Sequence, residues 1–307
     1  MRAAGVGTAP RRAAGANGLL YGLGAYGLWG VFPFFFDALA PAGSLEILAH
    51  RVVWTVLLLT VLLVAVRRLG DLREISSRTW ILLTVASGLI SSNWLIYIYS
   101  VNSDHVVDAA LGYFITPLVS VLLGVALFGE RLNRVQRVAL LLALAAVLLL
   151  SLGVGGPPLI AIGLALSFGL YGAVKKVVPT DPRVSVAVET AIAAPFAATY
   201  LVELHLSGQA EFTHHGPVHT TLMLLCGPVT AVPLLLFAAA AQRLPLVTLG
   251  LLQYLTPSMQ LTWGVLVDHE PMSPTRWAGF ALIWVALAVF SADALRKARA
   301  ERVARQE

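Results

Sequence analysis

One apolar stretch occurs twice in the chain, and its two copies decide the fold. The first copy, Tyr113–Glu130, reads YFITPLVSVLLGVALFGE, and the second, Tyr254–Glu270, reads YLTPSMQLTWGVLVDHE. Aligned on Pro117 and Pro257, the copies share Thr, Pro, Gly and Glu in a constant register. A helix needs about 20 apolar residues to cross a bilayer core. A duplicated stretch of nearly this length indicates a membrane protein built from two related halves.

The repeat continues outside these stretches. Further matched positions in the two halves are Tyr26–Gly30 with Phe168–Gly172, Glu46 with Glu189, and Asn102 with Gln242. Each half contains five apolar spans. Because five is an odd number, the second half must enter the membrane from the opposite side, so the sequence predicts inverted repeats. Inverted repeats are a common transporter design, with the substrate site where the repeats meet.

The composition also indicates a membrane protein. Hydrophobic residues make up 58% of the 307 residues, charged residues make up 12%, and the mean hydropathy is +0.81. A soluble domain carries about 25% charged residues, so a disordered chain and a nucleic-acid-binding protein are excluded as descriptions of the whole chain. The predicted fold is an all-α polytopic membrane protein with ten transmembrane helices in two inverted five-helix repeats. The predicted spans are 18–36, 45–66, 79–101, 106–128, 135–152, 158–178, 184–204, 219–241, 247–267 and 275–293.

The basic residues give the predicted orientation. All 21 lysines and arginines except Arg51 and Arg276 fall in the two tails or in the even-numbered loops. This asymmetry follows the positive-inside rule and predicts a multi-pass membrane protein with both termini in the cytoplasm. The predicted units are a cytoplasmic tail (1–17), a first repeat (18–152), a second repeat (158–293) and a basic cytoplasmic tail (294–307).

A cleavable signal peptide is the alternative for the first span. Arg11 and Arg12, the apolar stretch and Ala38–Ala40 together resemble such a peptide. The apolar stretch is longer than a usual signal core, and cleavage would leave an odd number of spans. A retained first helix is therefore favoured.

Several motifs in the first half resemble a known family. They are Glu46-Ile47-Leu48-Ala49-His50-Arg51, Asn93-Trp94, Leu111-Gly112-Tyr113-Phe114-Ile115-Thr116-Pro117-Leu118 and Gly129-Glu130-Arg131-Leu132. With the glycine-rich first span, they resemble the RarD family, in the EamA group of the drug/metabolite transporter superfamily. The resemblance covers residues 18–293. The EILAHR and LGYFI–PL strings are the more specific part, whereas the glycine-rich first span and Gly129-Glu130-Arg131-Leu132 are shared across the superfamily.

The resemblance implies both a fold and a function. It implies ten helices in two five-helix repeats, a central cavity lined by helices 1–4 and 6–9, and peripheral helices 5 and 10. It also implies an inner-membrane permease, usually described as an exporter, whose substrate is not settled. The chain departs from the family at Thr116, where Asn is frequent, and at Asp108, where Glu is frequent. Both changes could alter substrate preference without affecting the fold.

Ionisable residues inside the spans are the first functional candidates, because charge within a membrane is costly. Arg51 could bind an anion or gate the pathway, or it could pair internally with Glu46 or Asp108. Glu46 and His50 share a helix face and could carry a proton, although Glu46 could simply be a first-turn acid favoured by the helix dipole. Asp104 is interpreted as a helix cap, whereas Asp108 could line the pathway.

Helix breaks and aromatic residues form the second group of candidates. Tyr113, Thr116 and Pro117 correspond to Tyr254, Thr256 and Pro257, and paired broken helices point to a transporter site. The two prolines could instead kink their helices only for packing. The polar and aromatic residues expected at the cavity wall are Asn93, Tyr97, Trp94, Trp29, Tyr26 and Phe32, with Gln253 and Gln260 as weaker candidates.

Other polar residues have simpler interpretations. Glu130 and Glu270 are expected to fix turns at span ends, and Lys175 and Lys176 to end a helix at the cytoplasmic face. His214, His215 and His219 are not expected to bind a metal, because no cysteine supports them. Cys226, the one cysteine, excludes an intramolecular disulfide and is expected to be a buried apolar residue.

The sequence favours a secondary transporter over other membrane functions. It has no P-loop, HExxH or GxSxG motif and no acidic cluster suited to a diphosphate–magnesium site. A membrane enzyme acting on a lipid-linked substrate, and a non-transporting receptor or scaffold, are the alternatives. The expected partners are a small-molecule substrate, the lipid bilayer and, as coupling ion, protons. No cofactor and no nucleic acid are expected, and the oligomeric state is left open.

Overall fold

The computed structural model describes residues 9–102, 106–151, 159–266 and 273–303. Within these ranges every regular element is a helix. The elements are α1 (Ala9–Gly30), α2 (Phe32–Asp37), α3 (Ser44–Ala65), the 3₁₀ helix η1 (Leu69–Glu74), α4 (Ser77–Asn102), α5 (Val106–Phe128), α6 (Arg134–Ser151), α7 (Leu159–Val177), α8 (Pro182–Leu206), α9 (Gly216–Ala241), α10 (Leu246–Gln253), α11 (Leu255–Leu266) and α12 (Pro274–Val303).

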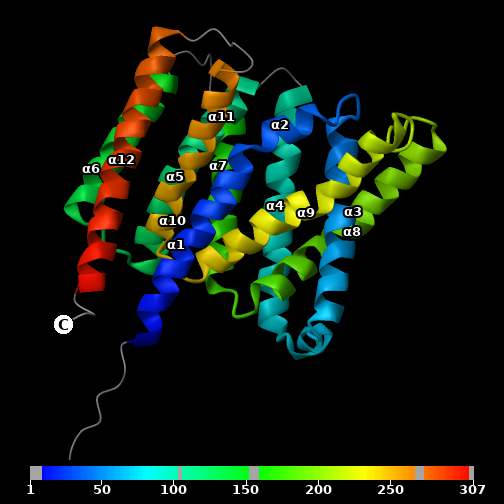
Figure 1. Cartoon of the computed structure of the whole chain (residues 1–307), viewed down its shortest axis with the longest axis horizontal. Helices are drawn as coiled ribbons and strands as arrows, with labels where there is room; N and C mark the ends of the chain where they lie inside the picture. The colour runs from blue at the N-terminus through cyan, green and yellow to red at the C-terminus, as the bar shows by residue number, and fades with distance from the viewer. Residues whose placement is uncertain (1–8, 103–105, 152–158, 267–272, 304–307) are drawn as a thin grey trace, which may run out of the picture.

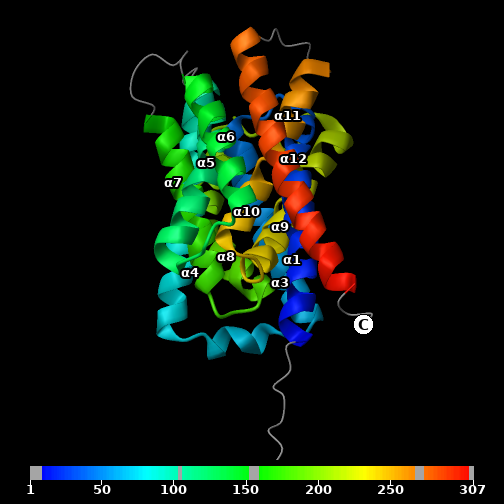
Figure 2. The same cartoon turned by 90° about the vertical axis from the view of Figure 1, so that its left-hand side faces the viewer.

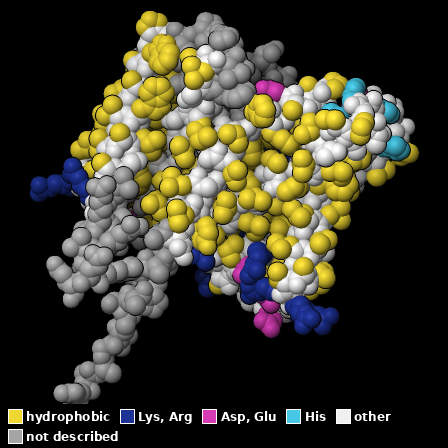
Figure 3. Space-filling model, viewed as in Figure 1, with side chains coloured by type: hydrophobic (Ala, Val, Ile, Leu, Met, Phe, Trp, Pro, Cys, Tyr) yellow, Lys and Arg dark blue, Asp and Glu magenta, His cyan; other side chains and the backbone are white. Residues whose placement is uncertain are grey.

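Eight stretches of the described chain are long and apolar enough to cross a membrane. They are the α1–α2 stretch Asn17–Asp37 and helices α3 to α9, the α4 and α5 spans being Ser77–Ser100 and Ala109–Phe128. Hydrophobic side chains are also spread over much of the described face seen in Figure 3. The protein is therefore an all-α, multi-pass membrane protein, as the sequence predicted.

The remaining two predicted spans have a different form. The predicted span 247–267 is divided at Tyr254 into α10 and α11, and the apolar part of α12 is the shorter stretch Trp277–Asp293. Neither meets the length requirement as a single apolar helix. The count of ten transmembrane helices stays a prediction.

The helices run up and down between two ends of the molecule (Figures 1 and 2). Helix α1 begins and α12 finishes at the lower end, whereas α7 begins at the upper end. Lysine and arginine side chains gather toward the lower end in Figure 3. The loops that the sequence assigned to one side of the membrane therefore lie on one side of the fold.

Helix packing follows a regular scheme. Helix α1 packs on α9 and α11, whereas α7 packs on α4 and α5. Helix α3 packs on α8 and α9, α4 also contacts α8, and α10 lies against α5. Helices α6 and α12 pair with each other along one side of the bundle (Figure 1). These two are the helices that the family resemblance placed at the periphery.

Close helix contacts depend on small residues, as is usual in membranes. Gly227 on α9 faces the backbone of α3, where Thr55 donates a 3.1 Å hydrogen bond from its hydroxyl to the Gly227 carbonyl oxygen. A Cβ atom at Gly227 would lie 2.8 Å from the carbonyl oxygen of Trp54. The backbone of α3 cannot move aside as a flexible side chain would.

We therefore expect Gly227→Ala to destabilise the protein by about 1–3 kcal/mol, the usual cost of overpacking. Thermal unfolding of the purified protein in detergent measures the change. The matched control is Gly88→Ala on α4, where an added Cβ would meet nothing within 4 Å. Since alanine favours helix, the control should be neutral or stabilising by up to about 1 kcal/mol. Equal effects of the two substitutions would contradict the packing argument.

Candidate functional site

A cavity of about 370 Å³ lies inside the helical bundle. Its walls come from the last turns of α1 and α4, the first turns of α3 and α5, and parts of α2, α7, α9, α10 and α11. Both halves of the chain therefore contribute. Most of these segments lie in the upper part of the molecule, away from the termini (Figures 1 and 2).

Aromatic rings form much of the cavity wall. Trp29 packs against two other rings of the wall, with ring-centroid distances of 5.7 Å to Tyr26 and 5.7 Å to Phe168. Phe237 backs the same cluster, 5.6 Å from Trp29. Trp94 also lines the cavity. The expected aromatic residues Tyr26, Trp29 and Trp94 thus line the same cavity.

Arg51 projects into this aromatic cavity from the second turn of α3. Its guanidinium carbon lies 4.9 Å from the ring centroid of Trp94, 5.3 Å from that of Phe36 and 5.8 Å from that of Phe32. Its Nε donates a 3.0 Å hydrogen bond to the hydroxyl of Thr230. Within the described part of the chain, Arg51 forms no ion pair with a carboxylate.

Glu46 and His50 lie away from the cavity wall. Glu46 is in the first turn of α3 but is buried, and its Oε1 accepts a 2.8 Å hydrogen bond from the backbone N–H of Glu211. The Nε2 of His50 lies 3.9 Å from the same oxygen, and its ring stacks on Phe212 at 4.7 Å. These residues join α3 to the segment between α8 and α9.

The remaining polar candidates divide into two groups. Asn93, Tyr97, Tyr113 and Thr256 line the cavity, together with Pro257. In addition, the Asn93 amide donates to the Leu164 carbonyl oxygen, and the Thr256 hydroxyl donates to that of Tyr26. These hydrogen bonds fix the two side chains in the wall.

Thr116 and Tyr254 are buried beside the cavity but do not line it. The Thr116 hydroxyl donates to the Gly112 carbonyl oxygen of its own helix at 2.8 Å. The Tyr254 hydroxyl donates to the Phe114 carbonyl oxygen at 3.3 Å, joining the two halves. Helix α5 runs unbroken through Pro117, whereas the helix break near Pro257 lies at Tyr254.

Two sets of predicted residues need separate mention. Asp104, the side chain of Asp108 and Glu270 lie outside the described residues. Among the histidines, His215 pairs with Glu211, and the Nε2 of His219 lies 3.1 Å from the carbonyl oxygen of Leu39. Within the described residues no group of three or more His, Cys, Asp or Glu side chains could hold a metal ion.

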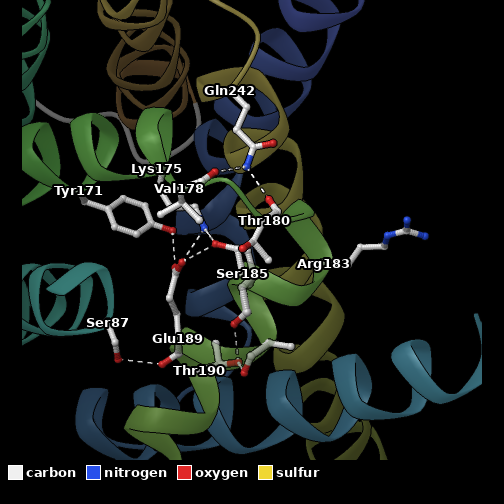
Figure 4. Close-up of polar contacts among 12 residues, drawn as sticks. Ser87, Tyr171, Lys175, Val178, Thr180, Arg183, Ser185, Glu189, Thr190 and Gln242 are labelled. Atoms are coloured by element: carbon white, nitrogen blue, oxygen red, sulfur yellow. Dashed lines mark hydrogen bonds and ion pairs between the residues drawn. The ribbon is translucent and has the colours of Figure 1, made fainter. Parts of the chain in front are cut away.

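A buried ion pair between α7 and α8 was not anticipated from the sequence (Figure 4). The Nζ of Lys175 lies 2.6 Å from Glu189 Oε1, and the two side chains are 0% and 3% exposed. The Ser185 hydroxyl donates to Glu189 Oε1 at 2.7 Å, and the Tyr171 hydroxyl donates to Oε2 at 3.1 Å. Lys175 was expected at the cytoplasmic face, but it turns inward because Glu189 and Ser185 satisfy its ammonium group there.

Glu130 is more than a turn residue. Its two carboxylate oxygens accept the backbone N–H groups of Leu246 and Val247, at 2.7 and 2.8 Å, at the start of α10. The Nζ of Lys176 lies 3.3 Å from the same carboxylate. One side chain of the first half is therefore bound to two elements of the second half at the lower end.

A second polar contact joins the halves at the lower end. Arg68 pairs with both Asp71 and Asp181, and Asp181 also accepts from Arg183. The hydrogen bond from the Arg183 side chain, helped by the charge of Arg68, lowers the pKa of Asp181 to about 2. This carboxylate therefore stays ionised at any physiological pH.

Comparison with known proteins decides the family. The sequence profile of the EamA-like transporter family matches this chain twice, over residues 16–152 and 157–292. The chain belongs to the EamA-like transporter family. This EamA-like chain is 50% identical to "Protein RarD" of Streptomyces exfoliatus over 93% of its own length and 91% of that protein. The resemblance to the RarD family is confirmed.

Other relatives support a membrane transporter. An "Uncharacterized transporter" of Vibrio cholerae is 40% identical over 94% of this EamA-like chain and 96% of its own length. A solved crystal structure, 19% identical, superposes with a TM-score of 0.69 over 89% of this chain and 98% of the other. At that identity the superposition shows the fold alone.

Proposed function

We propose that this protein is a secondary transporter that exports small polar or amphipathic metabolites or drugs through the central cavity by alternating access. The observation that carries this proposal is a cavity lined by both halves of the chain, with aromatic walls and a single guanidinium group among its described side chains. Ligand pockets are mostly apolar, with a few placed polar groups that fix orientation. The sequence contains no P-loop, HExxH or GxSxG motif, and the described residues contain no group that could hold a metal ion. An enzyme is therefore not favoured by any of these features.

The packing scheme supports inverted repeats. If the two halves are exchanged, the contact of α1 with α9 corresponds to that of α7 with α4, and the contact of α3 with α9 corresponds to that of α8 with α4. The contact of α5 with α7 likewise corresponds to that of α11 with α1. The opposite starting ends of α1 and α7 agree with this exchange (Figures 1 and 2). In alternating access, two similar halves exchange their conformations, so that the site between them opens first to one side of the membrane and then to the other.

The described conformation corresponds to one of the two alternating states. The cavity lies toward the upper end, while Glu130 and Asp181 tie the halves together at the lower, basic end. By the positive-inside rule the lower end is cytoplasmic. We therefore assign this conformation as closed to the cytoplasm, in a protein of the plasma (inner) membrane.

Protons are the proposed coupling ion, with facilitated movement as the alternative. Two buried carboxylates, Glu46 and Glu189, lie within the spans, where an ionisable group is a functional candidate. Glu189 also borders a small pocket that shares Ile90 and Trp94 with the cavity wall. Collapsing the proton gradient during a transport assay should abolish accumulation outside the cell, whereas facilitated movement would continue to equilibrium.

The function is tested by the metabolites that cells release. Cells producing the wild type should accumulate specific compounds outside, relative to an empty vector. Ala110→Trp, which fills the cavity from α5, should reduce this release to the vector level. Ala126→Trp, at an exposed position of the same helix, is the matched control and should behave as the wild type. Wild-type cells that match the vector under several growth conditions would contradict export.

A further inference from the structure

We infer that the cavity binds a small organic anion, whose acidic group is held by Arg51 and whose apolar body lies among the aromatic rings. This inference rests on the proposed transport function and specifies its substrate class. It starts from the unusual state of Arg51, a permanent cation inside a membrane protein with no carboxylate partner in the described part of the chain.

The guanidinium group has hydrogen-bonding capacity to spare. Arginine carries five N–H donors, and within the described residues Arg51 donates only from Nε, to Thr230. Its terminal nitrogens find no acceptor there, although the group lies at the cavity wall. A planar fork of this kind matches the two oxygens of a carboxylate. An anionic ligand would therefore complete the coordination that the protein leaves open.

Aromatic rings hold the cation in place without neutralising it. Trp94, Phe36 and Phe32 lie 4.9, 5.3 and 5.8 Å from the guanidinium carbon. Cation–π contacts contribute roughly 0.5–2 kcal/mol each and leave the net charge unchanged. The field of Arg51 in the low-dielectric cavity is consequently available to a ligand.

The nearby carboxylates on α2 and α3 do not pair with Arg51. Glu46, one turn before it, is bound to the backbone of Glu211. Asp37, at the end of α2, lines the same cavity but forms no ion pair with Arg51. An internal pair with Asp108 is the competing explanation, and it predicts no preference for anionic ligands.

The rest of the cavity fits an apolar body with one further polar contact. Tyr26, Trp29 and Phe168 present ring faces and edges rather than charges. Gln253 is 6% exposed, lines the cavity, and its Oε1 has no hydrogen-bond partner among the described residues. A buried polar atom is rarely left unpaired, so a hydrogen-bonding group on the ligand would satisfy it.

Three probes of one skeleton test this inference on the purified protein in lipid nanodiscs. They are 3-phenylpropionate, 3-phenylpropionamide and 3-phenylpropylamine, which carry a negative, a neutral and a positive head group. We expect 3-phenylpropionate to bind most tightly, as measured by quenching of tryptophan fluorescence. Arg51→Gln should weaken its binding about ten- to hundredfold, as expected for a lost hydrogen bond to a charged group, and should leave the amide unchanged.

Variants keep the test informative. Arg51→Lys retains the charge without the fork and should retain part of the preference for the anion. Arg243→Gln is the matched control, because Arg243 also lies over a ring, Tyr21 at 5.3 Å, but outside the cavity. Unchanged binding of the amide shows that Arg51→Gln is folded. Equal binding of acid and amide by the wild type, or an unchanged preference in Arg51→Gln, would overturn the inference.

A transport assay separates this inference from the proposed function. Wild-type protein in liposomes should move 3-phenylpropionate faster than the other two probes. Anion binding through Arg51 without movement of any probe would support the binding site and contradict transport. Preferred movement of the amine or the amide would support transport and overturn the anionic substrate class.

Discussion

Removing either partner of the buried ion pair is expected to destabilise the protein by about 3–5 kcal/mol, the usual cost of leaving a buried charge uncompensated. The two changes are Lys175→Met and Glu189→Gln. Lys175 is 0% exposed and Glu189 3% exposed at the side chain, and their charged atoms lie 2.6 Å apart. Thermal and denaturant unfolding of each purified variant, in the same detergent, measures the loss.

The double variant distinguishes the charge from the packing. Lys175→Met combined with Glu189→Leu removes both charges and keeps similar volume, and we expect it to recover much of the stability lost by either single change. Asp71→Asn is the matched control, because Asp71 pairs with Arg68 at about one-third exposure (36% and 34%). Such an exposed pair contributes about 0–1 kcal/mol. Single variants no less stable than this control would contradict the argument.

The ion pair of Lys175 with Glu189 also shows which features the sequence alone can predict and which it cannot. Apolar length and the distribution of lysine and arginine predicted the membrane class and most spans, because both patterns repeat along the chain. Neither pattern tells whether a lysine near the end of a span points to water or inward. The ion pair of Lys175 with Glu189 depends on how α7 and α8 are placed by α4 and α9, which both helices contact, and no local pattern encodes that placement. A signal was present, because Glu189 is an acid inside a predicted span that matches Glu46 in the repeat.

The cavity was anticipated only in part, for a related reason. Arg51, Asn93, Tyr97 and Trp94 were identified from their residue types at membrane depth, and they do line one cavity. His50 lies one position from Arg51 but faces Phe212, because neighbouring residues of a helix point in different directions. Helical spacing therefore predicts which residues share a face, but only the neighbouring helices decide which face is hollow.

The contact made by Glu130 is the basis of the second large effect. We expect Glu130→Gln to shift the protein toward conformations open at the lower end, which we propose to be cytoplasmic. The carboxylate caps the start of α10 through Leu246 and Val247 and lies 3.3 Å from the Nζ of Lys176. Loss of a cap and of a charge at a helix N-terminus costs roughly 1–3 kcal/mol, which corresponds to about a ten- to hundredfold change in an equilibrium.

Cysteine accessibility measures this shift. In a background lacking Cys226, a cysteine placed at the cavity position Thr256 should react in the wild type with an impermeant maleimide applied from outside the cell. Glu130→Gln should reduce this reaction and increase labelling in inverted vesicles. Glu74→Gln is the matched control, because Glu74 is an exposed acid at the same end of the molecule.

The direction of the change is what tests alternating access. If Glu130 served only to fix its own turn, its loss would lower stability and leave the ratio of outside to inside labelling unchanged. If the contact of Glu130 with α10 and Lys176 instead holds the two halves together at the lower end, its loss should change labelling in opposite directions on the two sides, because opening one end closes the other. The same contact explains why a glycine stands at position 124, where a Cβ would lie 2.8 Å from Glu130 Oε2. The missing side chain leaves room for the Glu130 carboxylate to reach the backbone N–H groups of α10. We therefore expect Gly124→Ala to shift labelling in the same direction as Glu130→Gln.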